Sequence, residues 1–253
     1  MKAFLSLDFS LANGRIKIKC FNKEMPMKTI NVLYEDNHLL VVTKPPNLLS
    51  QGDKTGDPDL LSILKDDLKE RHNKPGNVYL GLVHRLDRPV GGVMVFAKTS
   101  KAAARLSDQV RRNLFKKTYI AVIRGLPPRE KDTLIHYLLK NTKTNRVEAV
   151  KKGVKGAKEA ILDYEVISYA HPYCLVKIDL HTGRPHQIRV QFSKIGCPII
   201  GDQRYGYKDK YNHIALWAYK ISFEHPTLRK KVEFSALPEN RPPWSRFSLA
   251  KLK

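Results

Sequence analysis

From Cys174 to Arg189 the chain reads CLVKIDLHTGRPHQIR, and this stretch combines the two kinds of element that decide the fold. Its first seven residues mix apolar, β-branched and polar side chains in short alternation, which is typical of a β-strand. A helix is expected to begin near Pro185, because proline suits the first turn and apolar residues recur downstream at helical spacing. The polar segment between them predicts a strand-to-helix turn.

Short runs of this kind recur along the chain without an internal repeat. Further strands are expected at Asn31–Thr43, Val93–Lys98, Thr118–Ile123, Ala160–Ser168, Ile214–Phe223 and Lys231–Ser235. Further helices are expected at Leu60–Arg71 and Ser100–Phe115. The mixture predicts an α+β fold, with one sheet-centred domain over residues 31–253 and an extension over residues 1–30.

The charge of the chain is its unusual property. Its 253 residues are 42% hydrophobic and 28% charged, which is typical of a folded protein and excludes disorder, yet the net charge is +22. Such an excess predicts a polyanionic partner, nucleic acid before an acidic membrane surface. Residues 100–160 carry sixteen basic and five acidic side chains, half of the excess, and favour a phosphate-binding face over a merely solvated one. Within them, Lys140–Lys158 has the composition of a flexible segment.

Several classes of protein are excluded by what the sequence lacks. Three cysteines without a Cys-x-x-Cys pair give neither a disulfide framework nor a cysteine zinc site, and the nine histidines show no ligand spacing. There is no phosphate-binding loop, no Gly-x-Gly-x-x-Gly and no His-Glu-x-x-His. No apolar run reaches membrane-spanning length. We therefore expect a cytoplasmic protein without metal, cofactor or membrane contact.

A first polar cluster, His84-Arg85-Leu86-Asp87-Arg88-Pro89, carries one carboxylate among cationic side chains. Neighbouring positive charge favours the ionised form of Asp87, so it suits a nucleophile or base rather than an acid. The commoner explanation of such a pattern is a turn aspartate held in surface ion pairs. The residues alone leave both interpretations open.

A second polar cluster, His181–Arg189, occupies the strand-to-helix turn. Exposed backbone N–H groups at such a turn favour phosphate or carboxylate binding. The alternative is helix capping by Thr182 or His181, although Arg184 and Arg189 exceed what capping needs and one of them could reach Asp87 across the sheet. Tyr119, on an expected strand, is by itself no more than a half-buried sheet tyrosine.

Taken together, four segments stand in an order that resembles the RluA family of pseudouridine synthases. They are Val32–Pro46, His84–Asp87, Lys117–Tyr119, and Thr182–Arg189 with Gly201-Asp202. The resemblance covers roughly residues 31–235. It implies a mixed, largely antiparallel central sheet flanked by helices, an RNA-binding cleft and no cofactor.

The resemblance also implies the roles of individual residues. Asp87 corresponds to the nucleophile, Tyr119 to the tyrosine that packs on the target uracil, and Arg189 to the arginine that pairs with the nucleophile. Arg85 resembles the arginine that helps displace the target base. The remaining substrate-binding candidates are His84, Arg184, His186, Gln187 and Ile188.

Two departures from the family pattern are visible. Val90-Gly91-Gly92 follows the aspartate where the family usually has a Thr-Ser-Gly-like turn, so a hydroxyl contact from that turn is absent. The 30 residues ahead of the first motif are also too few for the S4-type RNA-binding module of larger relatives. Substrate binding is therefore expected to depend on the basic face of the catalytic domain.

The function predicted in this way is the isomerisation of specific uridines to pseudouridine in structured ribosomal or transfer RNA by a monomeric enzyme. The residues leave open whether Asp87 attacks C6 of the base, attacks C1′ of the ribose, or abstracts a ribose proton. The alternative from another class is a non-catalytic RNA-binding protein on the same fold. A metal-dependent nuclease lacks the clustered carboxylates that it would need.

Overall fold

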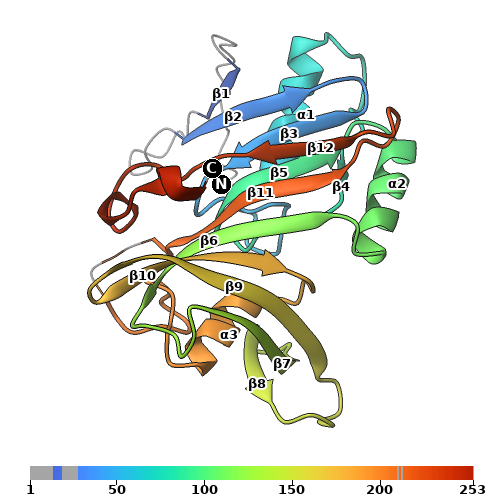
Figure 1. The fold of residues 1–253 in the computed structure, drawn as a ribbon. Helices are drawn as coiled ribbons and strands as arrows, with labels where there is room; N and C mark the ends of the chain where they lie inside the picture. Colours follow the sequence, from blue (N-terminus) through green and yellow to red (C-terminus); the bar gives the residue numbers. More distant parts are fainter. Residues whose placement is uncertain (1–13, 19–27, 210, 212, 253) are drawn as a thin grey trace. The chain divides into compact units, whose positions relative to one another are not determined.

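The structure is a computed structural model that describes residues 14–18, 28–209, 211 and 213–252 (Figure 1). The chain divides into two compact units. The first unit comprises Met1–Phe115 with Ser222–Ala236, and the second comprises Lys116–Ile221 with Leu237–Lys253. The predicted boundary between an extension over residues 1–30 and a domain over residues 31–253 stays a prediction.

The first unit is built on an antiparallel sheet. Its strands pair in the order β1 (Arg15–Ile18), β2 (Lys28–Glu35), β3 (Leu39–Lys44) and β5 (Gly91–Ala97), and the short β4 (Gly81–Leu82) also pairs with β5. β12 (Lys231–Ser235) follows the end of β11 (Leu216–Glu224) through a short turn. Every residue of β3 and β5 is buried, as their nearly continuous apolar sequences require.

Two helices accompany this sheet. α1 (Leu60–Arg71) has the predicted bounds, because Asp59 caps it by accepting a hydrogen bond from the backbone N–H of Ser62 at 3.0 Å. α2 (Ser100–Arg111) packs against β4 and β5 and is shorter than predicted. It ends because Asn113 adopts a left-handed conformation with φ 57°, and the N–H of Leu114 returns to the carbonyl of Gln109.

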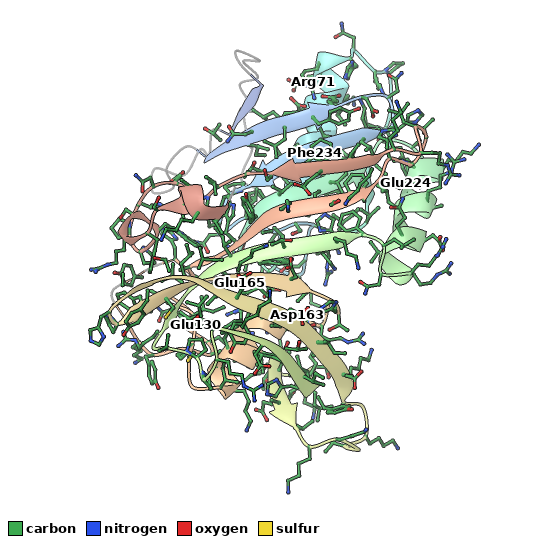
Figure 2. The ribbon with its side chains drawn as sticks, in the orientation of Figure 1. Arg71, Glu130, Asp163, Glu165, Glu224 and Phe234 are labelled. Carbon is green, nitrogen blue, oxygen red and sulfur yellow. The ribbon has the colours of Figure 1, made fainter. Side chains whose placement is uncertain are left out.

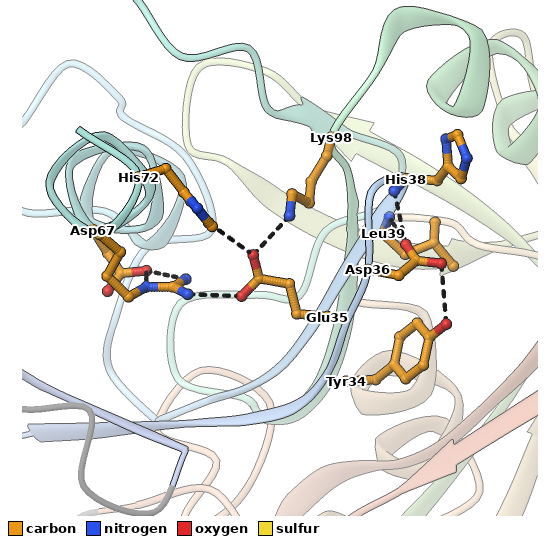
Figure 3. A network of polar contacts seen from close by, with 9 residues as sticks. Tyr34, Glu35, Asp36, His38, Leu39, Asp67, His72 and Lys98 are labelled. Carbon is orange, nitrogen blue, oxygen red and sulfur yellow. Dashed lines mark hydrogen bonds and ion pairs between the residues drawn. The ribbon is translucent and has the colours of Figure 1, made fainter. Parts of the chain in front are cut away.

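A partly buried ionic network connects α1 to β2 and to the end of β5 (Figure 3). Glu35 accepts hydrogen bonds from Arg71 Nη1 at 2.9 Å and from Lys98 Nζ at 2.7 Å, and Arg71 Nε also bonds to Asp67 at 2.8 Å. Burial opposes ionisation of Glu35, but the bonds from Lys98 and Arg71 outweigh it and lower its pKa. Asp67 is completely buried, and burial raises its pKa.

The prediction of one strand over Asn31–Thr43 is wrong, because the segment forms the two strands β2 and β3. Asp36 makes the turn between them: its Oδ1 accepts hydrogen bonds from the backbone N–H groups of His38 and Leu39, each at 2.7 Å. Tyr34 and His225 both contact the other carboxylate oxygen of Asp36. These bonds lower the pKa of Asp36 although burial opposes the shift.

The second unit contains a second run of antiparallel strands. They pair in the order β6 (Lys116–Arg124), β10 (Tyr173–Leu180), β9 (Lys158–Ala170), β7 (Lys131–Asn141) and β8 (Arg146–Val150). α3 (Gln187–Lys194) packs against β7 and β8, and two short 3₁₀ helices, Trp244–Arg246 and Leu249–Leu252, follow near the end of the chain. α3 begins two residues after Pro185, since His186 in front of it adopts a left-handed φ of 52°.

The prediction of a flexible segment over Lys140–Lys158 is also wrong. β8 forms a hairpin with β7, and Asn141 makes the turn by accepting hydrogen bonds from the backbone N–H groups of Lys143 and Thr144. A small apolar cluster stabilises the hairpin; its buried members are Leu138, Val147, Ala160 and Val190. The polar composition of the segment belongs to the exposed side of this hairpin.

The predicted fold class is confirmed. The structure combines α-helices with sheet strands, and each strand pair whose register it defines is antiparallel. Within residues 14–18, 28–209, 211 and 213–252, none of the helices combines the length and the apolar character that a membrane crossing demands.

Candidate active site

The predicted site residues lie in two groups. His84, Arg85 and Asp87 belong to the first unit, whereas Tyr119 and the residues from Arg184 to Arg189 belong to the second. The predicted pairing of Asp87 with Arg189 joins residues of different units and stays a prediction. Each group has a geometry of its own.

Asp87 lies in an irregular segment whose backbone is fixed on both sides of it. Before it, the Ser50 hydroxyl donates to the carbonyl of Leu86 at 2.8 Å and accepts from its N–H at 3.2 Å. After it, the buried ammonium of Lys44 donates to the carbonyl of Arg88 at 3.1 Å, and also to the carbonyls of Pro45 and Leu48. The Asp87 side chain is partly exposed. A carboxylate on so restrained a backbone is well placed for a nucleophile.

The basic neighbours of Asp87 differ from one another. Arg85 is exposed, and Arg88 forms an ion pair of 2.6 Å with Asp57 at the surface. His84 instead points inward: its Nε2 accepts a hydrogen bond from the backbone N–H of Val95 at 3.1 Å. The ring of His84 also packs on that of Phe115, with centroids 5.3 Å apart. His84 therefore supports β5, whereas Arg85 and Arg88 are exposed.

Tyr119 lies in the middle of β6, opposite Ile178 of β10, and is 8% exposed. Its neighbour Thr118 points to the other face, where the hydroxyl donates to Asp179 at 2.7 Å. Strand alternation places Lys117 on the same face as Tyr119. The ring of Tyr119 is thus mostly buried in the sheet.

The turn ahead of α3 is held by its own side chains. Thr182 accepts a hydrogen bond from the N–H of Ile161 on β9 at 2.8 Å and donates to Gln187 Oε1 at 2.8 Å. Gln187 also accepts from the N–H of Arg184 and donates to the carbonyl of Ile161. Gln187 and Ile188 are buried, at 3% and 5% exposure. In the structure, Gln187 fixes the turn through its hydrogen bonds, and Ile188 packs in the core.

Two further side chains connect the turn to β9, the strand that carries Asp163 (labelled in Figure 2). His181 contacts Asp163 at 2.6 Å, and Arg184 Nε donates to the carbonyl of Glu159 at 2.8 Å. Hydrogen bonds from Thr133 and His181 lower the pKa of Asp163. The second cluster thus spans the whole connection from β10 to α3 with side-chain contacts.

Arg189 is buried on α3 and forms a two-pronged ion pair with Asp202. Its Nε and Nη2 each lie 2.8 Å from one carboxylate oxygen, and its guanidinium lies 5.1 Å from the centre of the Tyr205 ring. Burial disfavours ionisation of Asp202, but Arg189 and the N–H groups of Arg204 and Tyr205 outweigh it and lower its pKa. Tyr205 also bonds to His186 through its hydroxyl at 2.6 Å. The guanidinium therefore has a fixed orientation.

Gly201, next to Asp202, is a position that only glycine can occupy. Its φ is 74°, and a Cβ atom there would lie 2.0 Å from the carbonyl oxygen of His213. The segment at Gly201 therefore packs closely against His213, next to the residue, Asp202, that pairs with Arg189.

The sequence analysis did not identify the supporting roles of three residues, Lys44, Ser50 and Asp202. Lys44 and Asp202 lie in the segments that carry the resemblance, but nothing in the sequence says that a lysine there is buried or that Arg189 has a carboxylate partner thirteen residues later. Their contacts are visible only in three dimensions. In the described part of the chain, no three or more His, Cys, Asp or Glu side chains gather as a metal site.

Residues 38–194 match the family model described as RNA pseudouridylate synthase, which is more than half of the chain. The chain belongs to that family. It is 34% identical over 237 residues to the ribosomal large subunit pseudouridine synthase C of Buchnera aphidicola subsp. Schizaphis graminum, covering 87% of this chain and 73% of the relative. An uncharacterized RNA pseudouridine synthase of Helicobacter pylori J99 is 32% identical, covering 89% and 71%.

Among solved structures, the human RNA pseudouridylate synthase domain containing 4 aligns with a TM-score of 0.71 at 23% identity, covering 87% of this chain and 92% of that one. This likeness supports the fold. The family predicted from the four segments is confirmed, and with it the prediction of an isomerase, an RNA pseudouridine synthase.

Proposed function

We propose that the chain isomerises specific uridines to pseudouridine in structured RNA, with Asp87 as the nucleophile. The observation that carries the proposal is the family match over residues 38–194, because that range contains Asp87, Tyr119 and Arg189. In this reaction the C1′–N1 bond of uridine breaks, the uracil turns over, and C1′ bonds to C5; C5 releases its proton to solvent and N1 takes up a proton from solvent, so that the product is an isomer of uridine. The reaction needs a nucleophile and a base-binding site but no redox partner.

The other roles follow the same proposal. Tyr119 packs on the target uracil, Arg189 neutralises and orients Asp87, and Arg85 helps displace the base from its stack. The exposure of Arg85 and the fixed guanidinium of Arg189 support these roles. Arg184 and His186 complete the substrate-binding surface, whereas Gln187 and Ile188 act through the shape of the turn and the inward-pointing His84 acts through its support of β5.

The decisive experiment compares Asp87→Asn with the native chain. We expect isomerisation to fall by about a thousandfold or more while the Kd for RNA stays within a few-fold, because a nucleophile acts in the transition state and contributes little to phosphate contacts. Tritium release from RNA labelled at C5 of uridine measures the reaction. Asp66→Asn, which changes an exposed carboxylate of α1, is the matched control. Native turnover by Asp87→Asn would remove Asp87 from the mechanism.

The same assay tests the second candidate, a non-catalytic RNA-binding protein on this fold. That candidate predicts no tritium release by the native chain and no difference between the two variants. The basic charge of the chain is compatible with both candidates, whereas the family match favours the enzyme.

We further propose that the substrate is ribosomal RNA of the large subunit, that the enzyme is a monomer, and that it works in the cytoplasm, with residues 31–253 as the catalytic domain. The name of the Buchnera relative supports the choice of substrate. Mapping pseudouridines in total RNA from cells with and without the gene tests it. Loss of sites in transfer RNA alone would contradict it.

A further inference from the structure

Lys117 is a basic side chain at the candidate site to which no role has yet been given. It is the second residue of β6 and lies on the same face of the strand as Tyr119. Lys116, one residue earlier, points to the opposite face and is exposed, whereas Lys117 is partly buried. The two lysines therefore differ in surroundings although they are neighbours in sequence.

The ammonium of Lys117 lies against the turn that precedes α3. A Cβ atom built on Gly183 would come within 3.3 Å of Lys117 Nζ, and no other heavy atom of the described residues outside Thr182–Arg184 would lie within 4 Å of it. Lys117 is thus the point where the β6 segment meets the second polar cluster. Both segments belong to the second unit and both carry proposed substrate-binding residues.

The charge of Lys117 is not compensated within the described residues. No carboxylate acts on it, and burial lowers its pKa. Two other lysines of the chain do have partners: Lys98 pairs with Glu35 at 2.7 Å, and the buried Lys44 donates to three backbone carbonyls. Removing an ammonium from water without giving it a partner costs free energy. An anionic ligand would offset this cost.

We propose that Lys117 binds a backbone phosphate of the RNA strand beside the target nucleotide. The inference rests on the proposed function, which supplies RNA as the ligand. Phosphate carries a full charge throughout the reaction, and a lysine ammonium, with three donors and no planar geometry, suits it as a point charge. Uracil is neutral when it binds, so it would not compensate the charge.

The first test compares Lys117→Met with Lys116→Met and Lys117→Arg. We expect Lys117→Met to weaken RNA binding about tenfold at low salt and to reduce the slope of log affinity against log salt by about 0.7, with turnover at saturating RNA within a few-fold of native. Lys117→Arg should recover most of the affinity. Equal losses from Lys116→Met would reveal a general charge effect and overturn the contact. Unchanged affinity with reduced turnover would also overturn it.

The second test uses the contact with Gly183. Gly183→Ala adds a methyl group whose one close neighbour among the described residues outside Thr182–Arg184 is Lys117 Nζ, so it should weaken RNA binding in the native chain and have no effect in the Lys117→Met background. Additive losses would overturn the inference. The melting temperature supplies an independent readout, because removing an uncompensated charge should leave it equal or higher. A lowered melting temperature with native affinity would mark Lys117 as structural.

These measurements separate the inference from the proposed function. RNA affinity and its salt dependence do not require turnover, so Lys117 can be tested even if the native chain releases no tritium. Conversely, native affinity in Lys117→Met together with an inactive Asp87→Asn would overturn the phosphate contact and leave the proposed function standing.

Discussion

Asp202 shows at the scale of one residue how a buried carboxylate is kept ionised. It is 1% exposed, and its charge is compensated by Arg189 and by two backbone N–H groups. Removing one partner of a buried ion pair leaves the other charge without compensation. We therefore expect Asp202→Asn to lower the free energy of unfolding by about 3 kcal/mol at neutral pH.

The pH dependence of this loss has a definite sign. Because the pKa of Asp202 in the folded protein lies below its ordinary value of 3.8, the native chain gains its full stabilisation above that value and loses it as the pH falls further. Urea unfolding at several pH values, followed by the fluorescence of Trp217 and Trp244 in the same unit, measures the difference. Glu148→Gln, an exposed change in that unit, is the control. A loss that stays constant down to acid pH would contradict the assignment.

At the same scale, the sequence was sufficient to nominate the residues with proposed roles, but not the residues that hold them in position. Asp87, Tyr119 and Arg189 stand in motifs with a fixed local spacing, so a single chain is enough to nominate them. Ser50 and Lys44 act on the backbone beside Asp87 from a different segment, and no local pattern encodes such a contact. Long-range partners of this kind need the fold.

At the scale of one element, the segment around Asp87 depends on a single hydroxyl. Ser50, 5% exposed, satisfies both the N–H and the carbonyl of Leu86. Ser50→Ala leaves these buried groups without that partner, which costs about 1–3 kcal/mol of stability. We expect turnover per folded molecule to fall about tenfold with RNA affinity unchanged, because the position of Asp87 relaxes.

Single-turnover tritium release on folded protein, with the melting temperature as a second readout, checks this prediction. Ser107→Ala, an exposed change on α2, serves as the control. If Ser50→Ala lowered only the melting temperature, the segment would be held by its other contacts, the bond from Lys44 included.

The elements themselves were predictable to different degrees, for physical reasons. α1 has the predicted bounds, and in the structure Asp59 caps its start while its apolar side chains are buried on one face. β8 was missed because its outward side chains, those of Arg146 and Glu148, are charged, and the burial of Val147 follows only from its packing with Leu138 and Val190 in the folded chain. The turn at Asp36 was missed because strong apolar runs on both sides suggested one strand. Both this turn and the turn between β7 and β8 are fixed by a side chain that accepts backbone hydrogen bonds, Asp36 in the first and Asn141 in the second.

At the scale of the whole molecule, the net charge of +22 is the property that most favours binding to RNA. Over residues 140–158, which include the β7–β8 turn, β8 and most of the loop to β9, seven basic side chains are exposed and Glu148 is the one acid: Lys140, Lys143, Arg146, Lys151, Lys152, Lys155 and Lys158. In the structure, part of the segment Lys140–Lys158, which was expected to be flexible, forms a hairpin with basic side chains on its surface. An ordered array can hold several phosphates at once with a smaller loss of conformational freedom.

If this hairpin follows the RNA backbone, the triple change of Lys143, Lys151 and Lys155 to Gln should weaken binding to every RNA tested. Each lost contact should flatten the slope of log affinity against log salt by about 0.7, or by about 2 in total, while turnover at saturating RNA barely changes. The matched control changes three exposed lysines of the first unit, Lys54, Lys69 and Lys74, to Gln and removes the same charge. A hairpin that only keeps the protein soluble predicts the same slope for both triple variants. That result would direct attention to α2 and the basic residues that follow it as the RNA-binding surface.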